Sequence, residues 1–286
     1  MKLARRYVEK PWGRDRLPAG FDAPEGKRIG EVWFGASADL PLLAKYLFTS
    51  DKLSVQVHPD DEQARAMGLA SGKTECWYVL DSEPGASIGL GLKQEMSGDA
   101  LRVSALDGSI EHRLDWREVR AGDFYFIPAG TIHAIGGGLA LLEFQQNSDV
   151  TFRLYDYGRP RDLHLDDALT VAKRRPYGER VQHLSGADDR VLVDGEAFTM
   201  VLSHEDALRY RRRWILPLAG KVRAGEDVAG AGECLLLEPG DRLESDGARM
   251  LIGASALRSL PARSRPAARR RCRVRARGYS RRRTEA

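Results

Sequence analysis

The chain has 286 residues, of which 42% are hydrophobic and 30% charged, and its formal net charge is +4; these values suit one large domain or two modest ones with a buried core. No apolar stretch approaches the roughly 18 residues that a membrane helix needs, and the charged first fourteen residues do not resemble a signal peptide. Three widely spaced cysteines provide neither a disulfide framework nor a paired-cysteine zinc site. We therefore expect a protein that neither spans a membrane nor depends on disulfides, and we expect a cytoplasmic location.

The first part of the chain alternates turns with short apolar runs. Residues 1–36 are rich in proline and glycine turns. Residues 41–48 predict a buried strand, and residues 53–58, which alternate in character, predict a second one. Residues 60–68 predict a short helix, because acids occupy the first turn and a glycine ends it. Residues 74–80 are rich in β-forming side chains and predict another strand.

The middle of the chain continues with short segments separated by glycine, aspartate and serine. Residues 99–109 fit a helix. Residues 124–127 and 139–144 flank a Pro-Ala-Gly turn and predict a hairpin-like pair of strands. Residues 164–172 predict a further short helix. Short strands therefore dominate this region, with a few short helices between them.

A strand-and-turn rhythm returns over residues 190–260. Within it, residues 232–241 resemble a degraded copy of residues 122–133 that has lost its histidine. Repeated short strands with polar turns indicate a mainly β fold, either a barrel or a sandwich. We interpret the chain as two β-barrel units, of which the first carries a site and the second carries none.

The C-terminal residues 262–286 differ from the rest in composition. They contain eleven arginines and one glutamate, so the remaining chain is net negative although the whole chain is net positive. With almost no bulky apolar side chains, this tail cannot offset its ordering entropy by burial, and we expect it to be disordered. Nucleic-acid binding would depend on the tail alone and is not expected.

The segment 122–133 provides the first sign of a metal site, since it spaces its residues as Gly-x5-Pro-x-Gly-x2-His and ends at His133. Gln56 and His58 stand two apart on a predicted strand and therefore share a face. Glu75 lies on the next predicted strand and adds a carboxylate. Two imidazoles, a carboxylate and an amide oxygen suit Zn²⁺ or a similar first-row ion.

Other polar residues fit the site less well. A single histidine is more often a core or surface residue than a ligand, so the interpretation depends on the joint spacing. The remaining histidines lack such a frame and are expected at the surface or in hydrogen bonds: His112, His164, His183 and His204. Three further acids could also approach an ion, although strand ends and helix starts commonly carry acids: Glu143, Asp60 and Asp61.

The glycine-proline-glycine-histidine segment resembles the second sequence motif of the cupin superfamily. Two departures from the usual cupin pattern are a glutamine at Gln56 in place of the first histidine and Gly137 where an asparagine is usual. These departures are similar to those of type I mannose-6-phosphate isomerases in their short bacterial form. The resemblance covers roughly residues 7–170 and rests on these ordered motifs: residues 9–13, 30–33, 41–45, 54–61, 72–78, 130–134 and 145–157.

The resemblance implies a cupin-type β-barrel, or jelly-roll, with a second, metal-free cupin-like β unit. We divide the chain into a metal-binding catalytic domain over residues 1–175, with its N-terminal extension, a second β domain over residues 176–261, and the tail 262–286. A monomer or a homodimer is expected, with a small sugar phosphate as its partner and no membrane association.

The resemblance also implies a function: a zinc-dependent aldose–ketose isomerase that interconverts mannose 6-phosphate and fructose 6-phosphate through a cis-enediol. It implies one zinc ion per chain, with these ligands: Gln56, His58, Glu75 and His133. Of these, Gln56 is not common to all short bacterial members. It assigns Arg153, Lys73 and Asp149 to catalysis.

The roles of the three catalytic residues stay open at this point. Arg153 is permanently charged and suits the enediolate oxygens. Lys73 is a base only if its pKa is depressed, and otherwise a cation for the sugar or phosphate. Asp149 either orients Arg153 or takes the proton itself. Further cations that suit the phosphate are Arg159 and Lys93, and the sequence does not choose among them.

Two other functions compete with the isomerase. Another metal-dependent cupin enzyme, such as an Fe²⁺ dioxygenase, would share the barrel and the two histidines. A cupin that binds sugar phosphates without catalysis would keep the site and lack turnover. The presence of Lys73 and Arg153 beside the full ligand set favours the isomerase over both.

Overall fold

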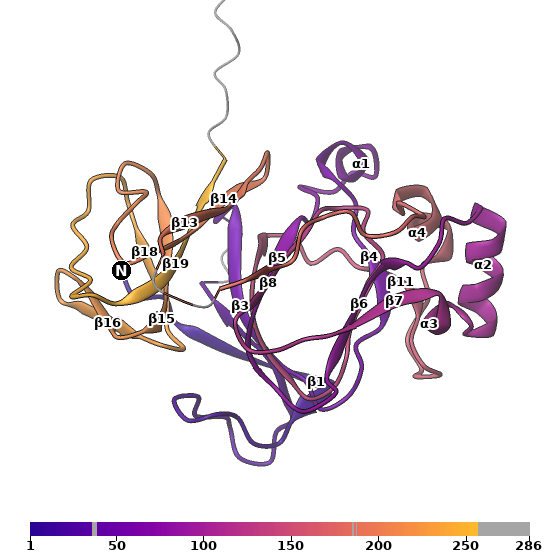
Figure 1. Cartoon of the computed structure of the whole chain (residues 1–286), viewed down its shortest axis with the longest axis horizontal. Helices are drawn as coiled ribbons and strands as arrows, with labels where there is room; N and C mark the ends of the chain where they lie inside the picture. The colour runs from indigo at the N-terminus through magenta and orange to yellow at the C-terminus, as the bar shows by residue number, and fades with distance from the viewer. Residues whose placement is uncertain (36–38, 185, 187, 257–286) are drawn as a thin grey trace, which may run out of the picture. The chain divides into compact units, whose positions relative to one another are not determined.

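The computed structural model describes residues 1–35, 39–184, 186 and 188–256, which lie in one unit, Met1–Ala256. The predicted tail, residues 262–286, lies outside the described residues. Strands dominate the described part (Figure 1). The prediction of a mainly β fold with a few short helices is confirmed.

Two antiparallel sheets enclose the interior of a jelly-roll barrel. Within the described residues, the larger sheet has seven strands, in this order: β1 (Arg5–Arg14), β2 (Ile29–Phe34), β3 (Leu42–Phe48), β10 (Leu139–Gln146), β5 (Glu75–Ser82), β8 (Asp123–Ile127) and β12 (Gln182–His183). The smaller sheet, over the same ranges, has five: β11 (Phe152–Tyr155), β4 (Val55–Val57), β9 (His133–Ile135), β6 (Ser87–Leu92) and β7 (Leu114–Glu118).

The barrel interior changes from apolar to polar along its strands. On β10, Leu139 and Leu141 join an apolar cluster that draws on both sheets. Side chains alternate across a strand, so Glu143 and Gln145 share the inward face with these leucines. Both are buried, although they are polar. The apolar half closes the barrel, and the polar half is where a site can form.

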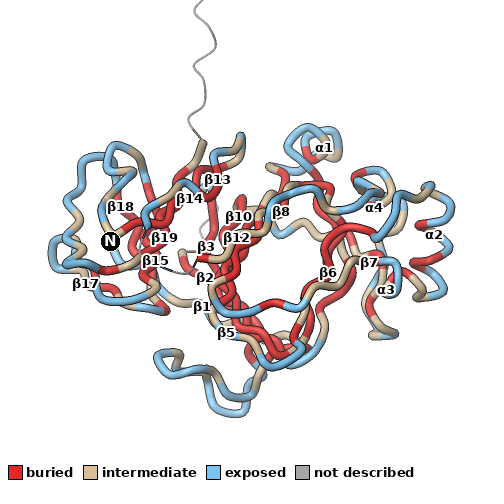
Figure 2. Tube along the Cα trace, in the orientation of Figure 1, coloured by how far each residue is buried: buried red, intermediate tan, exposed pale blue. Residues whose placement is uncertain are grey.

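The outer faces of both sheets are also covered. The opposite face of the seven-stranded sheet packs through Phe144 against Phe198 and Trp214 of the C-terminal strands, with ring centroids 5.4 and 5.9 Å apart. These C-terminal strands form a five-stranded sheet and a two-stranded one in the part of the chain that the structure describes: β13 (Arg190–Asp194), β14 (Phe198–Ser203), β19 (Arg249–Ser255), β15 (Arg213–Ala219) and β18 (Leu235–Leu237), then β16 (Lys221–Ala224) and β17 (Asp227–Gly230). Figure 2 shows the buried strands between the exposed turns. The proposed domain boundary at residue 175 stays a prediction.

Short helices lie beside the smaller sheet and at its connections (Figure 1). The helices of the described residues are α1 (Asp61–Ala66), α2 (Gly98–Asp107), α3 (Ile110–Arg113) and α4 (Leu165–Val171). Three of them fall in the predicted segments, whereas α3 was not predicted. Helix α1 begins with a capping box, in which Asp60 and Gln63 exchange backbone-to-side-chain hydrogen bonds of 2.8 and 3.0 Å.

The N-terminal segment differs from its prediction as a turn-rich region. Strands β1 and β2 pair there, and their register shifts between Glu9 and Arg14. The segment around Pro11 and Gly13 lies at this irregularity. Because β1 is the edge strand of its sheet, a proline costs no hydrogen bond to a further strand. Long-range pairing therefore overrides the local turn signals.

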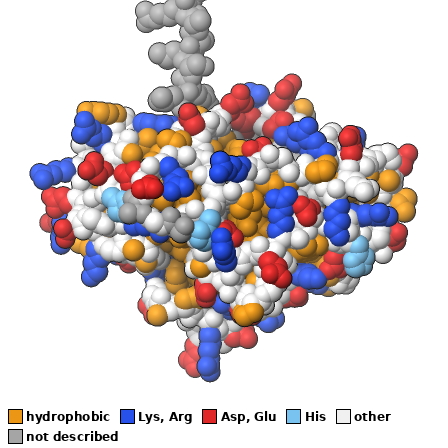
Figure 3. Space-filling view, viewed as in Figure 1, with side chains coloured by type: hydrophobic (Ala, Val, Ile, Leu, Met, Phe, Trp, Pro, Cys, Tyr) orange, Lys and Arg blue, Asp and Glu red, His pale blue; other side chains and the backbone are white. Residues whose placement is uncertain are grey.

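The surface and the helices give two further observations. Figure 3 shows basic and acidic side chains interspersed across the viewed face of the described residues. Among the helices in the described ranges, none combines the length and the apolar composition that a membrane crossing requires.

Candidate metal centre

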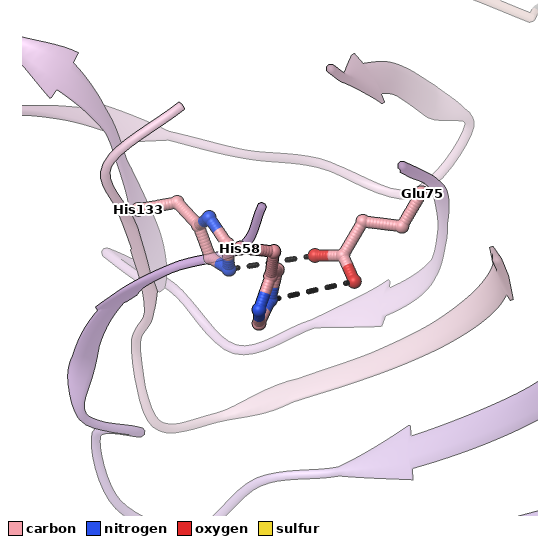
Figure 4. Close-up of side chains that lie close together, drawn as sticks. All are labelled: His58, Glu75 and His133. Carbon is pink, nitrogen blue, oxygen red and sulfur yellow. Dashed lines mark ion pairs between the residues drawn. The ribbon is translucent and has the colours of Figure 1, made fainter. Parts of the chain in front are cut away.

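His58, Glu75 and His133 meet in the polar half of the barrel (Figure 4). His58 follows β4, whereas Glu75 and His133 are the first residues of β5 and β9. Glu75 Oε1 lies 3.4 Å from His133 Nε2, and Glu75 Oε2 lies 3.8 Å from His58 Nε2. One ligand atom from each residue lies within 4.8 Å of the others. The three side chains converge on a common point, as the sequence predicted for a shared ion.

A tight turn aims His133 at this point. The turn precedes β9 and contains Gly130, whose φ of +84° is a conformation that favours glycine. The Gly130 N–H donates to the carbonyl oxygen of His58 at 2.8 Å, which ties the turn to the end of β4. A Cβ on Gly130 would also meet the Val171 carbonyl oxygen at 3.0 Å. The glycine of the motif is therefore required by its backbone conformation and by its close contacts.

Both histidines have the protonation state of a ligand. His133 Nδ1 lies 3.0 Å from the Thr131 carbonyl oxygen, to which it can only donate, so Nε2 of the neutral ring carries the lone pair that a metal ion would use. Burial lowers the pKa of His133 to about 4. Burial, and then the Lys73 cation, lower the pKa of His58 well below its ordinary value. Neutral imidazoles bind metal ions without first losing a proton.

The third residue of the cluster is a buried carboxylate with one oxygen that lacks a partner. Glu75 is 1% exposed; its Oε2 lies 3.2 Å from Lys73 Nζ, whereas its Oε1 has no hydrogen-bond partner among the described residues. Burial raises its pKa to about 7. Buried polar atoms normally have partners, and two neutral imidazoles with a carboxylate oxygen that lacks one match the ligand set of a Zn²⁺ site. The residues therefore fit a divalent ion.

Gln56 lies beside the cluster but presents its amide nitrogen to it. Its Nε2 is 3.2 Å from His133 Nε2, while its Oε1 accepts a hydrogen bond from Ser54 Oγ at 3.1 Å. Metal coordination needs the oxygen, so the amide has to exchange its oxygen and nitrogen positions to serve as a ligand. Such a flip alters neither the backbone nor the shape of the side chain.

Lys73 contacts the cluster from the cavity side. Its Nζ lies 3.2 Å from Glu75 Oε2 and 3.2 Å from His58 Nε2. Burial alone would lower the pKa of Lys73, but the carboxylates of Glu75 and Glu143 outweigh it and raise the pKa. The two roles that the sequence left open for Lys73, cation and base, stay predictions.

A cavity of about 240 Å³ lies against the cluster, and four of the residues predicted from the sequence line it: Gln56, Lys73, Asp149 and Arg153. Every lysine on its wall has a carboxylate partner at 3.2 Å, in these pairs: Lys10–Glu31, Lys45–Glu143 and Lys73–Glu75. Lys93 and Arg159, which the sequence offered for the phosphate, are not among the described residues that line the cavity.

Arg153 lies across the sheet from the cluster. It pairs in register with Gln56, which pairs in turn with His133, so the three residues form a row across β11, β4 and β9. Burial, and then the neighbouring Arg161 guanidinium, lower the pKa of Arg153. Among the described residues, no carboxylate oxygen forms an ion pair with Arg153, although the Asp149 carboxylate is close enough to raise its pKa in part.

Several cavity residues were not assigned to the site from the sequence. Lys45 had a signal, because a lysine inside the apolar run 42–48 is 3% exposed and needs a buried partner. His164 was expected at the surface or in a hydrogen bond; it accepts a hydrogen bond from Arg153 N at 3.3 Å and also lines the cavity. Arg161 lines the cavity through a loop whose path has no local sequence signature.

Two other histidines, which were expected at the surface or in hydrogen bonds, each contact an aspartate. His183 Nδ1 lies 2.8 Å from an Asp123 oxygen, and His204 Nδ1 lies 2.8 Å from an Asp189 oxygen.

Known proteins resemble this chain in sequence and in fold. No protein-family model matches it. A mannose-6-phosphate isomerase of Streptococcus mutans is 42% identical over 243 residues, which cover 69% of this chain and 76% of that protein. The crystal structure of mannose 6-phosphate isomerase from Bacillus subtilis has a TM-score of 0.73 at 26% identity and covers 88% of this chain and 98% of that one.

A zinc-bound mannose 6-phosphate isomerase structure shares the fold, with a TM-score of 0.69 at 15% identity over 90% of this chain and 99% of that one. The fold of the described residues, the converging His-Glu-His cluster and the sequence identity to the Streptococcus mutans enzyme agree with one another. The chain belongs to the mannose-6-phosphate isomerase family.

Proposed function

We propose that this chain is a zinc-dependent aldose–ketose isomerase that interconverts mannose 6-phosphate and fructose 6-phosphate. The observation that carries the proposal is the His58–Glu75–His133 cluster, which contacts Gln56 and Lys73 on the wall of a cavity lined largely by polar and charged side chains. Family membership supports the choice of substrate. The cytoplasmic location and the choice between monomer and homodimer stay predictions.

His58, Glu75 and His133 would hold one Zn²⁺ per chain, and Gln56 would be the fourth ligand after its amide flips. A zinc ion held in this way supplies Lewis acidity toward adjacent oxygens of the substrate. The zinc-bound relative supports the choice of ion.

The reaction moves a proton between C1 and C2 of the sugar through a cis-enediol, so negative charge develops on the two neighbouring oxygens. Arg153 and Lys73 both line the cavity and are both cationic. Preformed cations at the place where charge develops stabilise the transition state without reorganising. We assign Lys73 and Arg153 to this task rather than to proton abstraction.

Asp149 is our candidate for the proton carrier. It lines the cavity and makes no ion pair with a described residue, so its oxygens are available to substrate. Glu143 is the other cavity carboxylate near the cluster, but Lys45 lies 3.2 Å from it and the Trp77 indole N–H donates to it at 3.1 Å. These contacts make Glu143 the weaker base.

The test is a coupled isomerase assay on metal-stripped protein, with and without added Zn²⁺. We expect conversion of mannose 6-phosphate that depends on zinc. Binding of the sugar phosphate without conversion would favour the non-catalytic cupin. Activity that requires Fe²⁺ and O₂ would favour a dioxygenase, and either result would contradict the proposal.

A further inference from the structure

The basic residues of the cavity fall into two groups that differ in their partners. The three lysines each lie 3.2 Å from a carboxylate, so their charges are compensated on the wall itself. The two arginines, Arg153 and Arg161, also line the cavity and lie close enough for their charges to interact; we call this pair the arginine rim. A dianionic ligand needs cations with donors to spare, and the arginine rim supplies them.

Arg161 is held rigidly by a buried acid. Its Nε and Nη2 donate to the two oxygens of Asp156 at 2.5 and 2.6 Å, and Asp156 is 2% exposed. The same carboxylate also pairs with Arg159 at 2.9 Å. One buried negative charge is thus shared by two guanidinium groups, so Arg161 keeps net positive charge. It lines the cavity, and its Nη1 donates to no other described residue.

His164 adds a neutral donor to this rim. The backbone N–H of Arg153 donates to the ring Nδ1 of His164 at 3.3 Å, and the backbone N–H of His164 donates to the Arg153 carbonyl oxygen at 2.8 Å. Because Nδ1 accepts, the ring proton of the neutral imidazole is on Nε2. His164 lines the same cavity, so the ring Nε2–H is available to an acceptor there.

We propose that Arg161 and His164 form the phosphate-binding end of the cavity, with Asp156 as the residue that positions Arg161. This inference rests on the proposed function, since it takes the ligand to be a phosphate monoester of a sugar. The substrate then lies along the row from His133 through Gln56 to Arg153, with its C1–C2 end at the metal cluster and its phosphate beyond Arg153. A guanidinium held by two bonds to a carboxylate presents its remaining N–H groups in a fixed plane, which suits phosphate oxygens.

The test compares Arg161→Met with Arg159→Met. Both arginines bind Asp156, but Arg161 lines the cavity and Arg159 does not belong to its described lining. For each variant we would measure kcat and KM for mannose 6-phosphate and the inhibition constant of inorganic phosphate. R161M should raise KM and the inhibition constant by roughly tenfold to a hundredfold, the worth of a charged hydrogen bond, with kcat changed less. R159M should stay near wild type in both constants.

Three outcomes would overturn the inference. One is an R161M enzyme with a low kcat but wild-type KM and phosphate inhibition. Another is an equal rise of KM in both variants, which would show that Asp156 and its loop matter only for folding. The third concerns the conservative variant Arg161→Lys, which keeps the charge but loses the planar fork of donors, so its KM should be intermediate. A wild-type KM in both R161K and R161M would contradict the inference.

Calorimetry with glucitol 6-phosphate, which cannot be isomerised, separates this inference from the proposed function. If the wild type binds this probe and R161M weakens binding, the phosphate end stands even when no isomerase activity is found. If the wild type isomerises mannose 6-phosphate and R161M binds the probe equally well, the phosphate end is wrong and the proposed function stands. His164→Ala should weaken binding of the same probe, and unchanged binding would remove His164 from the site.

Discussion

Gln56 and His133 lie directly opposite each other on strands β4 and β9, and their Nε2 atoms are 3.2 Å apart. This contact joins the residue in which the chain departs from the usual cupin pattern to the histidine that ends the glycine-proline motif. Ser54 holds the amide in this orientation through its hydrogen bond to Gln56 Oε1. A metal ion at the cluster would compete with Ser54 for that oxygen.

Gln56→Leu should therefore weaken zinc binding, since the leucine removes the fourth donor and keeps a similar volume. We expect a loss of roughly tenfold to a hundredfold in affinity, in the range of other changes at metal sites, measured by competition with a chelator. Ser54→Ala is the matched control and should leave the affinity within a few-fold, because it removes a competitor for the same oxygen. Equal zinc affinity in Q56L and wild type would limit the ligands to the two histidines and Glu75.

Zinc should stabilise the fold only when the cluster is intact. An ion that binds the folded state alone raises the melting temperature, and it also supplies a partner for the buried Oε1 of Glu75. We expect His133→Ala to lose both the single bound zinc and the zinc-dependent rise in Tm. His183→Ala is the control, since His183 binds Asp123 at 2.8 Å and lies outside the described cluster. A normal zinc content in H133A would place the metal elsewhere.

The buried pair of Lys45 and Glu143 allows a prediction about stability and pH. Both side chains are 5% exposed or less, and removing one partner of a buried pair costs about 3–5 kcal/mol. Burial raises the pKa of Glu143, but Lys45 and then Lys73 outweigh it and lower the pKa. The pair thus stabilises the fold at pH values above the ordinary glutamate pKa. This contribution is lost as the pH falls through the lowered pKa of Glu143 in the folded protein.

In Lys45→Met the pKa of Glu143 should rise, so the variant gains a proton at higher pH than wild type does. The destabilisation should be largest near pH 8 and smaller near pH 5, as measured by urea unfolding. Lys27→Met breaks the exposed pair of Lys27 and Glu9, at 2.7 Å, and should cost under about 1 kcal/mol at either pH. A cost for K45M that is the same at both pH values would show that Glu143 does not titrate with the pair.

The sequence predicted the parts of this site that depend on local order. Gln56 lies on β4 and His58 directly follows that strand, and a glycine-framed turn precedes His133. Each of these patterns spans only a few residues of the sequence, and the structure brings the three residues together with Glu75. The arginine rim depends on where the loop of residues 156–164 returns, which is a long-range property. Strand β1 was missed for a similar reason, because its pairing with β2 outweighs the turn residues inside it.

Asp149→Asn should abolish most turnover while mannose 6-phosphate still binds, because the amide keeps the size of the carboxylate and cannot take a proton. A loss of kcat by roughly a hundredfold or more is expected if Asp149 is the general base, with KM and zinc content near wild type. Glu143→Gln is the comparison, since Glu143 lies in the same cavity wall but is engaged by Lys45 and Trp77. If E143Q instead loses more kcat than D149N does, at unchanged zinc content, the proton carrier is Glu143. Bound substrate would then have to raise the lowered pKa of the Glu143 carboxyl group.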